Sequence, residues 1–417
     1  MRNLIVSKSD MTGGASRAAH RLHNALISEH IDSKMLVCSK KSHDYRVIGP
    51  ESTTQKILAK IPAVLDNLPM CLQHTDNPTT HSPAYIGGIS AKQINAVDTD
   101  VVNLHWICGG TLAIKEIAKI TKPVIWTMHD MWAFCGAENY VPDSINARFR
   151  SGYKYNNRGP NHTGFDIDRW TWSRKLAHWK KPFEVITPSR WLADCVKASA
   201  LMHNWPVTII PNVLDTETFK PHPKGLAREK LGLPRDVKLV LFGAIGGTRD
   251  SRKGWDLLQQ SLVISSGQNP GLHGVILGQH EPYNFSNIGV PLHWLGHIDS
   301  DLTLALVYSA VDVTVLPSRQ ENLPQIGTEA QACGCPVVAF DTCGLPDVVV
   351  HELTGYLATA FSVGDLAHGI SWVLNDQERH VILSAKARER SLNIWSQDII
   401  ARQYIEIYSR SMESYHN

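Results

Sequence analysis

Two glutamates beside a predicted helix end are the strongest candidates for chemistry in this 417-residue chain. Glu321 lies in a polar loop after a short apolar run typical of a buried strand, and Glu329 follows eight positions later. Leu323 and Pro324 are expected to open the helix that carries Glu329, because proline is tolerated in a first turn. The free amides of such a helix end suit a diphosphate and the two carboxylates suit hydroxyl groups, which together describe a sugar nucleotide.

The first half of the chain offers histidines instead. Two predicted strands, residues 101–106 and 123–130, each end near a histidine: His105 in the first, and His129 followed by Asp130 in the second. The carboxyl ends of parallel strands meet at one edge of a sheet, so these side chains are expected to lie close together. A single histidine at a strand end is more often structural, and the pair is the stronger candidate.

Strands alternate with helices in both halves of the chain, which predicts parallel sheets. We expect an α/β protein with two Rossmann-like domains whose parallel sheets face a central cleft, where such folds bind ligands. Residues 213–225, rich in proline and turn formers, are the best linker candidate. The expected domains are residues 1–205 and 206–395, with a last helix over residues 396–417 that crosses back to the first domain.

Composition limits the class of protein. With 43% hydrophobic and 19% charged residues, the chain can build ordinary cores. Its eight cysteines lack CxxC spacing and are expected to be reduced thiols, with Cys333 and Cys335 in the core. No signal-peptide pattern and no apolar stretch of about 18 residues occurs, so we expect a cytoplasmic protein. Peripheral contact at the inner face of the cytoplasmic membrane stays open.

Charge is distributed unevenly along the chain. Residues 1–205 hold 25 Lys and Arg against 17 Asp and Glu, and residues 206–417 hold 16 against 22. Different partners for the two halves and simple solvated faces explain this equally well.

Two segments leave alternatives open. Residues 147–181 carry nine Lys and Arg interleaved with aromatic residues, which suits anionic lipid headgroups or a phosphate-bearing acceptor. Single-stranded nucleic acid ranks lower, and a solvated loop with packed tryptophans is as good an explanation as a membrane. Residues 56–68 are predicted to form an amphipathic helix that rests on a membrane or on its own domain, and we favour the domain.

An ordered set of motifs resembles glycosyltransferase family 4, the retaining enzymes of GT-B fold, over nearly the whole chain. The motifs are the Gly13-Gly14 loop, LHW with His105, TMHD with His129, TPSRWLA, IIPNVLD, RKG ending at Gly254, LGHI ending at Ile298, and PSRQENLPQIGTEAQACGCPVV with both glutamates. HDMWAFCG is similar to the branch that acts in bacterial exopolysaccharide and O-antigen assembly, such as colanic-acid transferases. That branch often has a cysteine cluster after this motif; here only Cys135 is present, which argues against a local metal site.

The resemblance implies roles for individual residues. In the family the first glutamate contacts the donor sugar and the second the nucleotide ribose, which assigns Glu321 and Glu329. Lys253 matches the lysine of a basic pair that holds the donor diphosphate. The usual place of the arginine is taken by another residue here, and Arg249 is the expected substitute. His129 matches a histidine close to the donor sugar.

The complete expected site, with residues 1–205 binding the acceptor and residues 206–395 the donor, is as follows. The expected catalytic residues are His129, Arg249, Lys253 and Glu321. The expected donor-binding residues are Gly13, Gly14, Arg249, Lys253, Gly278, His297, Ile298, Glu321, Asn322, Leu323, Pro324, Gln325 and Glu329. The expected acceptor-binding residues are His105, Asp130 and Trp132.

The implied function is a retaining glycosyltransferase that moves a sugar from a UDP- or GDP-sugar to a glycan or lipid-linked oligosaccharide in surface polysaccharide synthesis. Negative charge appears on the leaving diphosphate, and fixed cations and amides stabilise it. We therefore expect no metal and no cofactor. No residue is an obvious covalent nucleophile, so we expect front-face attack, with the leaving phosphate accepting the proton.

Two other functions remain as alternatives. A nucleotide-sugar epimerase of the same fold would change the sugar nucleotide without an acceptor, and the basic aromatic segment argues against it. A non-catalytic nucleotide-sugar-binding protein would bind the donor without transfer or hydrolysis.

Overall fold

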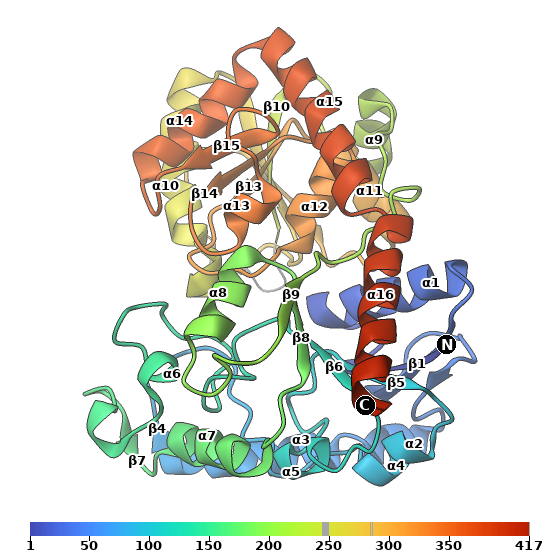
Figure 1. The fold of residues 1–417 in the computed structure, drawn as a ribbon. Coiled ribbons are helices and arrows are strands. Elements are labelled where there is room, and N and C mark those ends of the chain that lie inside the picture. The colour runs from blue at the N-terminus through green and yellow to red at the C-terminus, as the bar shows by residue number, and fades with distance from the viewer. Residues whose placement is uncertain (244–249, 284, 286, 417) are drawn as a thin grey trace. The chain divides into compact units, whose positions relative to one another are not determined.

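The computed structural model describes residues 1–243, 250–283, 285 and 287–416. The chain forms two compact units (Figure 1). The first consists of Met1–Val213 together with Ile400–Asn417, and the second of Leu214–Ile399.

The first unit is built on a parallel sheet with the strand order β3-β2-β1-β5-β6-β8-β9. Its strands are β1 Arg2–Ser9, β2 Asp32–Ser39, β3 Val47–Ile48, β5 Val101–Leu104, β6 Val124–Thr127, β8 Glu184–Thr187 and β9 Val207–Ile209. A short antiparallel pair joins β4 Gln73–His74 to β7 Thr163–Gly164. The helices are α1 Gly14–Ser28, α2 Thr53–Leu58, α3 Ile61–Asn67, α4 Ala91–Ala96, α5 Ile114–Ile117, α6 Arg148–Ser151, α7 Ile167–His178 and α8 Arg190–Ala198, with 3-10 turns η1 Leu68–Leu72 and η2 Tyr155–Asn157.

Burial on both faces explains why the central strands are almost wholly apolar. Every residue of β5 and β6 is buried, as expected where helices cover both sides of a parallel sheet. The strands predicted over residues 101–106 and 123–130 end earlier than expected, at Leu104 and Thr127. His105 and His129 therefore lie in the loops that follow the carboxyl ends of the two strands.

The last helix, α16 (Gln397–His416), completes the core of the first unit. Asn103 Nδ2 donates to the Tyr408 hydroxyl at 2.8 Å, and the Tyr404 hydroxyl lies 3.2 Å from Thr127 Oγ1. Both tyrosines are buried, so residues from the end of the chain support the two strands that lead to the histidines.

The second unit repeats the pattern with a parallel sheet ordered β12-β11-β10-β13-β14-β15. Its strands are β10 Lys238–Gly243, β11 Leu272–Leu277, β12 Leu292–Gly296, β13 Val313–Leu316, β14 Val337–Phe340 and β15 Gly355–Ala358. Its helices are α9 Lys224–Leu231, η3 Ser251–Lys253, α10 Trp255–Gln268, α11 Asp301–Ala310, α12 Gln325–Ala332, α13 Leu345–Val348, α14 Val363–Leu374 and α15 Gln377–Ile394. The predicted α/β class with a parallel sheet in each half is confirmed, and Cys333 and Cys335 are buried in the second core as predicted.

Two predicted helices differ in the structure. The helix expected over residues 56–68 is broken into α2 and α3, because Pro62 in the first turn of α3 lacks the N–H needed to continue α2. The sequence also predicts a helix over residues 111–119, where the structure forms only the four-residue helix α5. The sequence analysis also missed β15, a four-residue strand at the edge of its sheet.

The basic segment 147–181 directs several of its cations inward. Lys175 is fully buried, its ammonium donates to the carbonyls of Trp132, Cys135 and Gly136, and burial lowers its pKa to about 7. Arg174 likewise donates to two backbone carbonyls, of Pro83 and Ala84. These cations hold the unit together and are not part of a solvated loop.

Candidate functional site

A lysine, an arginine and a glutamate meet beyond the carboxyl end of β13 in the second unit. The Lys253 ammonium donates to Glu321 Oε1 and forms an ion pair with it. The Arg252 guanidinium lies 3.2 Å from the same oxygen and donates to Gln320 O at 2.9 Å. Glu321 is only 7% exposed, so these charges interact where solvent screens them weakly.

The two cations set the protonation state of Glu321. Burial alone would raise the pKa of Glu321, but the charges and hydrogen bonds of Lys253 and Arg252 outweigh it and hold the pKa below its ordinary value. The group is therefore a carboxylate at neutral pH and accepts hydrogen bonds only. Sugar hydroxyls are donors of the kind it requires.

Backbone contacts fix the loop that carries the cations. Asp250 accepts from Arg252 N at 3.0 Å, and Arg319 N donates to Arg252 O at 2.8 Å, which ties this loop to the one after β13. Gly254 has a φ of 71°, and a Cβ there would lie 1.9 Å from Pro317 O. Only glycine fits at this position, which explains the last residue of the RKG motif.

The helix after the loop, α12, supplies the second carboxylate. Pro324 occupies its N-cap position, Gln325 begins it, and Asn322 and Leu323 just before it are buried. The start of α12 thus directly follows the loop that carries Glu321, and a helix has the positive end of its dipole at this N-terminal end. Glu329, in the second turn, is buried and accepts from the Tyr308 hydroxyl at 2.6 Å.

The remaining predicted donor residues follow β11 and its neighbour β12, which is an edge strand of the sheet. Gly278 has a φ of 100° and donates its N–H to Gly296 O at 2.7 Å. His297 Nε2 lies 3.1 Å from Asp299 Oδ1, and Ile298 packs against the core of the unit.

Arg252 is a residue that the sequence analysis overlooked. The expected arginine, Arg249, lies outside the residues that the structure describes, whereas Arg252 contacts the Glu321 carboxylate. The signal was present in the RKG motif, where Arg252 directly precedes Lys253. The contact itself depends on two successive side chains of one 3-10 turn reaching the same oxygen, which sequence does not reveal.

The Gly13-Gly14 loop lies between β1 and α1 in the first unit. Gly13 has a φ of 86°, a left-handed conformation that favours glycine. A cavity of about 460 Å³ opens here, lined by Lys8, Ser9, Thr12, Gly13, Gly14, Ala15, Ser16, Ser39 and Trp106. The Lys8 ammonium lies 5.2 Å from the centre of the Trp106 ring. One cation and the start of a fifteen-residue helix make this cavity suitable for an anion.

The two histidines of the first unit lie together, as predicted. His105 Nδ1 is 3.0 Å from His129 Nε2. Burial and the neighbouring His129 hold the pKa of His105 well below its ordinary value, and burial lowers the pKa of His129 to about 4. Both rings are therefore neutral near pH 7. His129 is the partly exposed member of the pair and the one that can meet a ligand.

Burial corrects the prediction that Trp132 contacts the acceptor. Its ring is enclosed in the core, and its Nε1 donates to Ser82 O at 2.8 Å, so it cannot meet a ligand. Asp130 is also largely enclosed, and it accepts from Trp106 Nε1 at 2.7 Å and from Trp132 N at 3.0 Å. Its observed contacts position the loop that follows β6.

Among the residues that the structure describes, no group of three or more His, Cys, Asp or Glu is arranged to hold a metal ion. Two D-x-D sequences in the first unit make other contacts. Asp98 and Asp100 pair with Arg2, and Asp168 is buried and accepts from Gln73 Nε2 at 2.7 Å.

Comparison with known families follows the two units. The model of Glycosyltransferase Family 4 matches residues 12–218, and the model of Glycosyl transferases group 1 matches residues 224–390. The chain carries both domains of the GT-B glycosyltransferases. The GT-B fold and the group 1 and family 4 glycosyltransferase domains inferred from the motifs are confirmed.

Curated relatives in this family align with half of the chain. The D-inositol 3-phosphate glycosyltransferase of Thermobispora bispora is 28% identical over 226 residues, which are 50% of this chain and 52% of that protein. The protein of the same name from Saccharomonospora viridis is 31% identical over 229 residues, 50% of this chain and 51% of its own. The chain thus spans about half the length of the curated relatives it matches.

Solved GT-B structures resemble nearly the whole chain. Sucrose-phosphate synthase from Thermosynechococcus elongatus has a TM-score of 0.66 at 18% identity and covers 99% of this chain and 100% of its own. Anabaena HepE, in complex with UDP and glucose, has a TM-score of 0.66 at 17% identity and covers 98% and 100%. No helix within the described part of the chain is both long and apolar enough to span a bilayer.

Proposed function

We propose that the chain transfers a sugar from a nucleotide-sugar donor to an acceptor hydroxyl, with retention of the anomeric configuration. The second unit binds the donor: Lys253 and Arg252 meet the diphosphate, Glu321 the sugar and Glu329 the ribose. The observation that carries the proposal is the ion pair of Lys253 with buried Glu321. It lies beside the start of α12 and therefore combines cation, carboxylate and helix amides at one place.

The proposed donor is a UDP-sugar. Anabaena HepE, which shares the fold, is described in complexes with UDP and glucose and with UDP-glucose. A GDP-sugar would use the same diphosphate contacts, so the base is the part of the donor that needs a direct measurement. The buried Glu329 carboxylate is suited to accept hydrogen bonds from ribose hydroxyls.

The chemical step requires charge stabilisation more than a nucleophile. Cleavage of the anomeric C–O bond leaves negative charge on the diphosphate, and one preorganised donor at such a site contributes about 3 kcal/mol, roughly a hundredfold in rate. We assign this stabilisation to Lys253, Arg252 and the α12 amides, without a metal or cofactor. The leaving phosphate then accepts the acceptor's proton in a front-face attack. His129 and Arg249 stay proposed catalytic residues.

The proposed acceptor is a glycan or lipid-linked oligosaccharide of bacterial O-antigen or exopolysaccharide assembly, as the HDMWAFCG motif suggests. Contact with an anionic membrane would bring such an acceptor within reach. A phosphorylated polyol is the second candidate, because the curated relatives are named D-inositol 3-phosphate glycosyltransferases. The cavity with Lys8 at the start of α1 is suited to a phosphate group of that acceptor.

A donor screen tests the proposal. UDP-, GDP- and ADP-sugars are compared by thermal shift, because a ligand bound only by the folded protein raises the melting temperature. Slow release of sugar from the stabilising donor is followed by NMR, which also gives the anomer formed. Retained configuration and loss of turnover in Glu321→Ala, with unchanged melting temperature, are expected. Donor binding without any turnover would instead indicate a binding protein, and acceptor-independent conversion of the sugar nucleotide an epimerase.

A further inference from the structure

Three short elements of the first unit expose apolar side chains. Large apolar residues at the surface of α2, α3 and η1 form what we call the apolar patch: Ile57, Leu58, Ile61, Val64, Leu65, Leu68 and Leu72. Helix α2 has no buried residue among those described, and in α3 the only buried residue is Asp66. The expectation that this segment rests its apolar side on its own domain is therefore wrong. Contiguous apolar surface of this kind marks an interaction site.

Polar contacts hold α3 in this inverted orientation. The buried Asp66 carboxylate accepts from the backbone N–H groups of Ala84 at 3.1 Å, Tyr85 at 2.8 Å and Ile86 at 3.2 Å. The Tyr85 hydroxyl donates to Leu65 O at 2.6 Å. The helix is thus attached through its one acid, and its leucine side faces outward.

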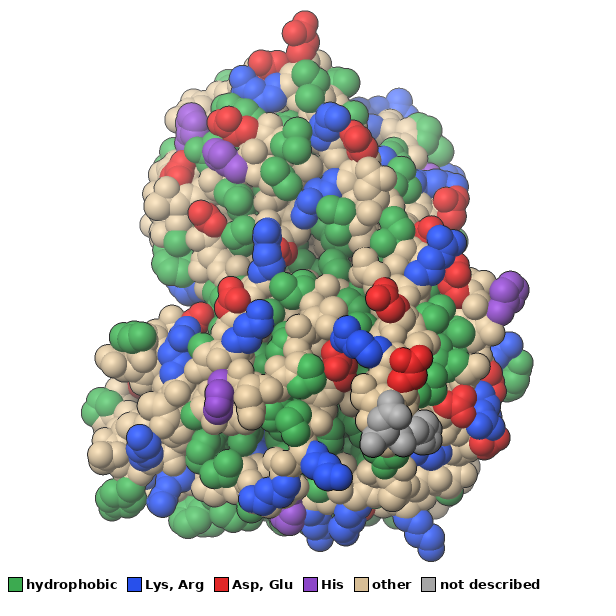
Figure 2. Space-filling view, viewed as in Figure 1, with side chains coloured by type: hydrophobic (Ala, Val, Ile, Leu, Met, Phe, Trp, Pro, Cys, Tyr) green, Lys and Arg blue, Asp and Glu red, His purple; other side chains and the backbone are tan. Residues whose placement is uncertain are grey.

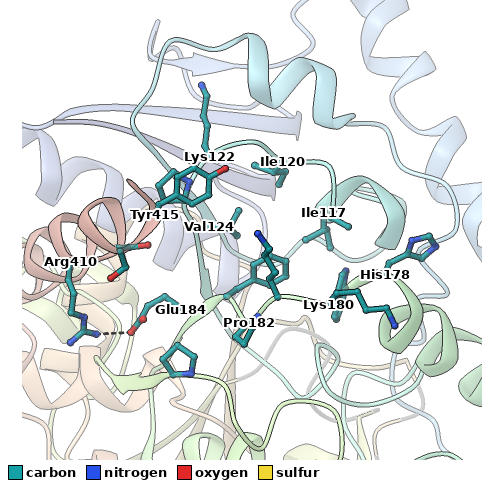
Figure 3. A pocket seen from close by; sticks show the side chains of 18 residues that line it. Ile117, Ile120, Lys122, Val124, His178, Lys180, Pro182, Glu184, Arg410 and Tyr415 are labelled. Atoms are coloured by element: carbon teal, nitrogen blue, oxygen red, sulfur yellow. Dashed lines mark hydrogen bonds and ion pairs between the residues drawn. The ribbon is translucent and has the colours of Figure 1, made fainter. Parts of the chain in front are cut away.

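Helix α7 continues the patch and ends in a basic cavity. Phe165 N donates to Leu72 O at 2.8 Å, and the rings of Tyr85 and Trp170 lie 5.9 Å apart, so aromatic residues border the apolar patch. Figure 1 shows α3, α5 and α7 on the same side of the sheet. At the end of α7 lies a cavity of about 1110 Å³ (Figure 3). Its cationic and imidazole side chains are Lys122, His178, Lys180, Lys181 and Arg410.

The segment that carries the apolar patch and the segment of α7 contain no exposed Asp or Glu among their residues, all of which the structure describes. Among residues 52–75 and 167–183, all of which the structure describes, the only acids are Asp66 and Asp168, and both are buried. Glu184 at the cavity is neutralised by Arg410 at 2.7 Å. Figure 2 shows lysine, arginine and apolar side chains together along the lower edge of the first unit. The surface therefore combines apolar contact area with positive charge.

The basic cavity lies away from the histidine pair of the first unit. The basic cavity is lined by Val124 and Glu184, the first residues of β6 and β8. His105 and His129 follow the opposite, carboxyl ends of the same parallel sheet. A ligand on the cavity side can therefore be held without occupying the histidine edge.

We propose that the apolar patch, α7 and the basic cavity form one face that docks on an anionic lipid bilayer. The apolar side chains of α2, α3 and η1 enter the acyl boundary, Tyr85 and Trp170 lie at the interface, and the lysines of the cavity meet the headgroups. This inference supplies a surface for the proposed membrane contact and rests on that proposal. Docking can be tested independently of sugar transfer, because vesicle binding is measured with no donor or acceptor present.

Vesicle sedimentation tests the docking face. The full chain is mixed with vesicles of phosphatidylcholine alone or mixed with phosphatidylglycerol. We expect binding to the anionic vesicles, roughly tenfold or more weaker in the double variant Val64→Asp, Leu68→Asp. Charge reversal by Lys180→Glu, Lys181→Glu is also expected to weaken binding roughly tenfold or more, with weaker binding of the unchanged protein at high salt.

Matched controls come from the second unit. Val381 and Ile382 on α15 are 58% and 59% exposed, close to the 63% and 55% of Val64 and Leu68, so their double change to aspartate adds the same charge at equal exposure. Lys220→Glu, Lys230→Glu reproduces the charge reversal. Both controls are expected to bind vesicles within about twofold of the unchanged protein. Each variant must keep the melting temperature and the donor hydrolysis of the unchanged protein. If the proposed function were wrong, the unchanged protein would itself show no donor hydrolysis, and vesicle binding could still be measured.

Several results would overturn the docking face. These are absence of vesicle binding, equal losses in patch and control variants, and displacement from vesicles by inorganic phosphate at constant ionic strength, which would assign the cavity to a soluble anion. If the patch variants instead changed the oligomeric state in analytical ultracentrifugation and left vesicle binding intact, the face would be a contact between copies of the chain.

Discussion

The second unit contains two clusters of the same composition, one at each end of β13. Beyond its carboxyl end, Glu321 is shared by Lys253 and Arg252. Just before its amino end, Asp312 is shared by Lys224 at 2.6 Å and Arg228 at 2.9 Å. Both pair a lysine and an arginine with one carboxylate, yet we assign chemistry to the first and structure to the second.

Their other contacts explain the difference. Arg228 is buried and also donates to the carbonyls of Ala310 at 2.8 Å and Val237 at 3.0 Å, and Asp312 accepts from Leu239 N at 2.7 Å. That cluster joins strands to each other and to α9. The Glu321 cluster joins two loops at the edge where parallel sheets bind ligands, beside the start of α12. Position on the sheet, and not residue type, separates a ligand site from a structural one.

The largest expected effect is on catalysis. Lys253→Ala should lower kcat/KM for transfer about a hundredfold or more, because a cation fixed at the leaving diphosphate contributes about 3 kcal/mol. The matched change Lys224→Ala in the Asp312 cluster should leave kcat/KM within about twofold. Initial rates over a range of donor concentrations measure both. Equal losses in the two variants would remove the distinction between the clusters.

The converse change tests the structural cluster. Asp312→Asn leaves the buried Arg228 guanidinium without its counter-charge and should lower the free energy of unfolding by about 2 kcal/mol. Denaturant unfolding measures this loss, and rates at a temperature where the variant is folded should stay close to those of the unchanged chain. A fully stable Asp312→Asn would contradict the role given to the cluster.

As the pH falls, the Glu321 cluster and the histidine pair of the first unit should lose their contributions to stability in different pH ranges. The pKa of His129 is lowered to about 4, so the folded form resists protonation, and stability falls as pH drops from about 6.5 toward 4. The pKa of Glu321 is also lowered, but its contribution is complete above the ordinary carboxyl pKa and is lost only as pH falls through the folded value. Between pH 7 and 5, β5 and β6 should lose hydrogen-exchange protection through the histidine pair.

The expected magnitude for His129 alone is roughly 2 kcal/mol between pH 6.5 and 5, from about 1.4 kcal/mol per pH unit, and the lowered pKa of His105 acts in the same direction. Rates of exchange are corrected for the intrinsic effect of pH. His129→Gln should weaken the pH dependence of hydrogen-exchange protection in β5 and β6. In both proteins, protection of the segment from β13 to α12 should keep the contribution of the Glu321 ion pairs. A profile that His129→Gln leaves unchanged would show that this histidine does not control it.

The smallest expected effect concerns Glu329, the carboxylate that we propose binds the ribose of the donor. Tyr308→Phe removes the 2.6 Å hydrogen bond to Glu329 and should raise the donor KM about fivefold, with little change in kcat, because the bond positions a group that binds substrate and transition state alike. Steady-state kinetics separate the two constants. A fall in kcat alone would place Glu329 closer to the reacting bond than the ribose.

Much of this fold was accessible from the sequence, for a physical reason. Strands buried on both faces are continuous apolar runs, so the strands predicted over residues 101–106 and 123–130 and in the apolar run before Glu321 correspond to β5, β6 and β13. Helix α11, Asp301–Ala310, also carries a local signal in the sequence, because Ser300 caps it and an apolar run fills it. The edge strand β15, with only four residues, carries too little pattern to be recognised.

The site was less accessible, because burial and pairing are properties of the folded chain. The motif placed Lys253 and Glu321 in one candidate site but did not show that Arg252 shares the carboxylate. Trp132 follows a motif histidine closely, yet its ring lies in the core. The segment 56–68 shows this limit of the sequence pattern most clearly. Amphipathic spacing predicts an apolar and a polar face, but it does not predict which face packs against the protein. In α3 the hydrogen bonds of the buried Asp66 carboxylate direct the polar side inward.

The position of helix α16 in the chain has a consequence for folding during synthesis. Only the first residues of α16 belong to the compact unit of residues 214–399, whereas Tyr404 and Tyr408 lie in the core of the first unit beside Asn103 and Thr127. We therefore expect the hydrophobic interior of residues 1–213 to close only after residues 400–416 have been synthesised. A nascent chain that lacks α16 should present an unfinished first unit to chaperones and proteases.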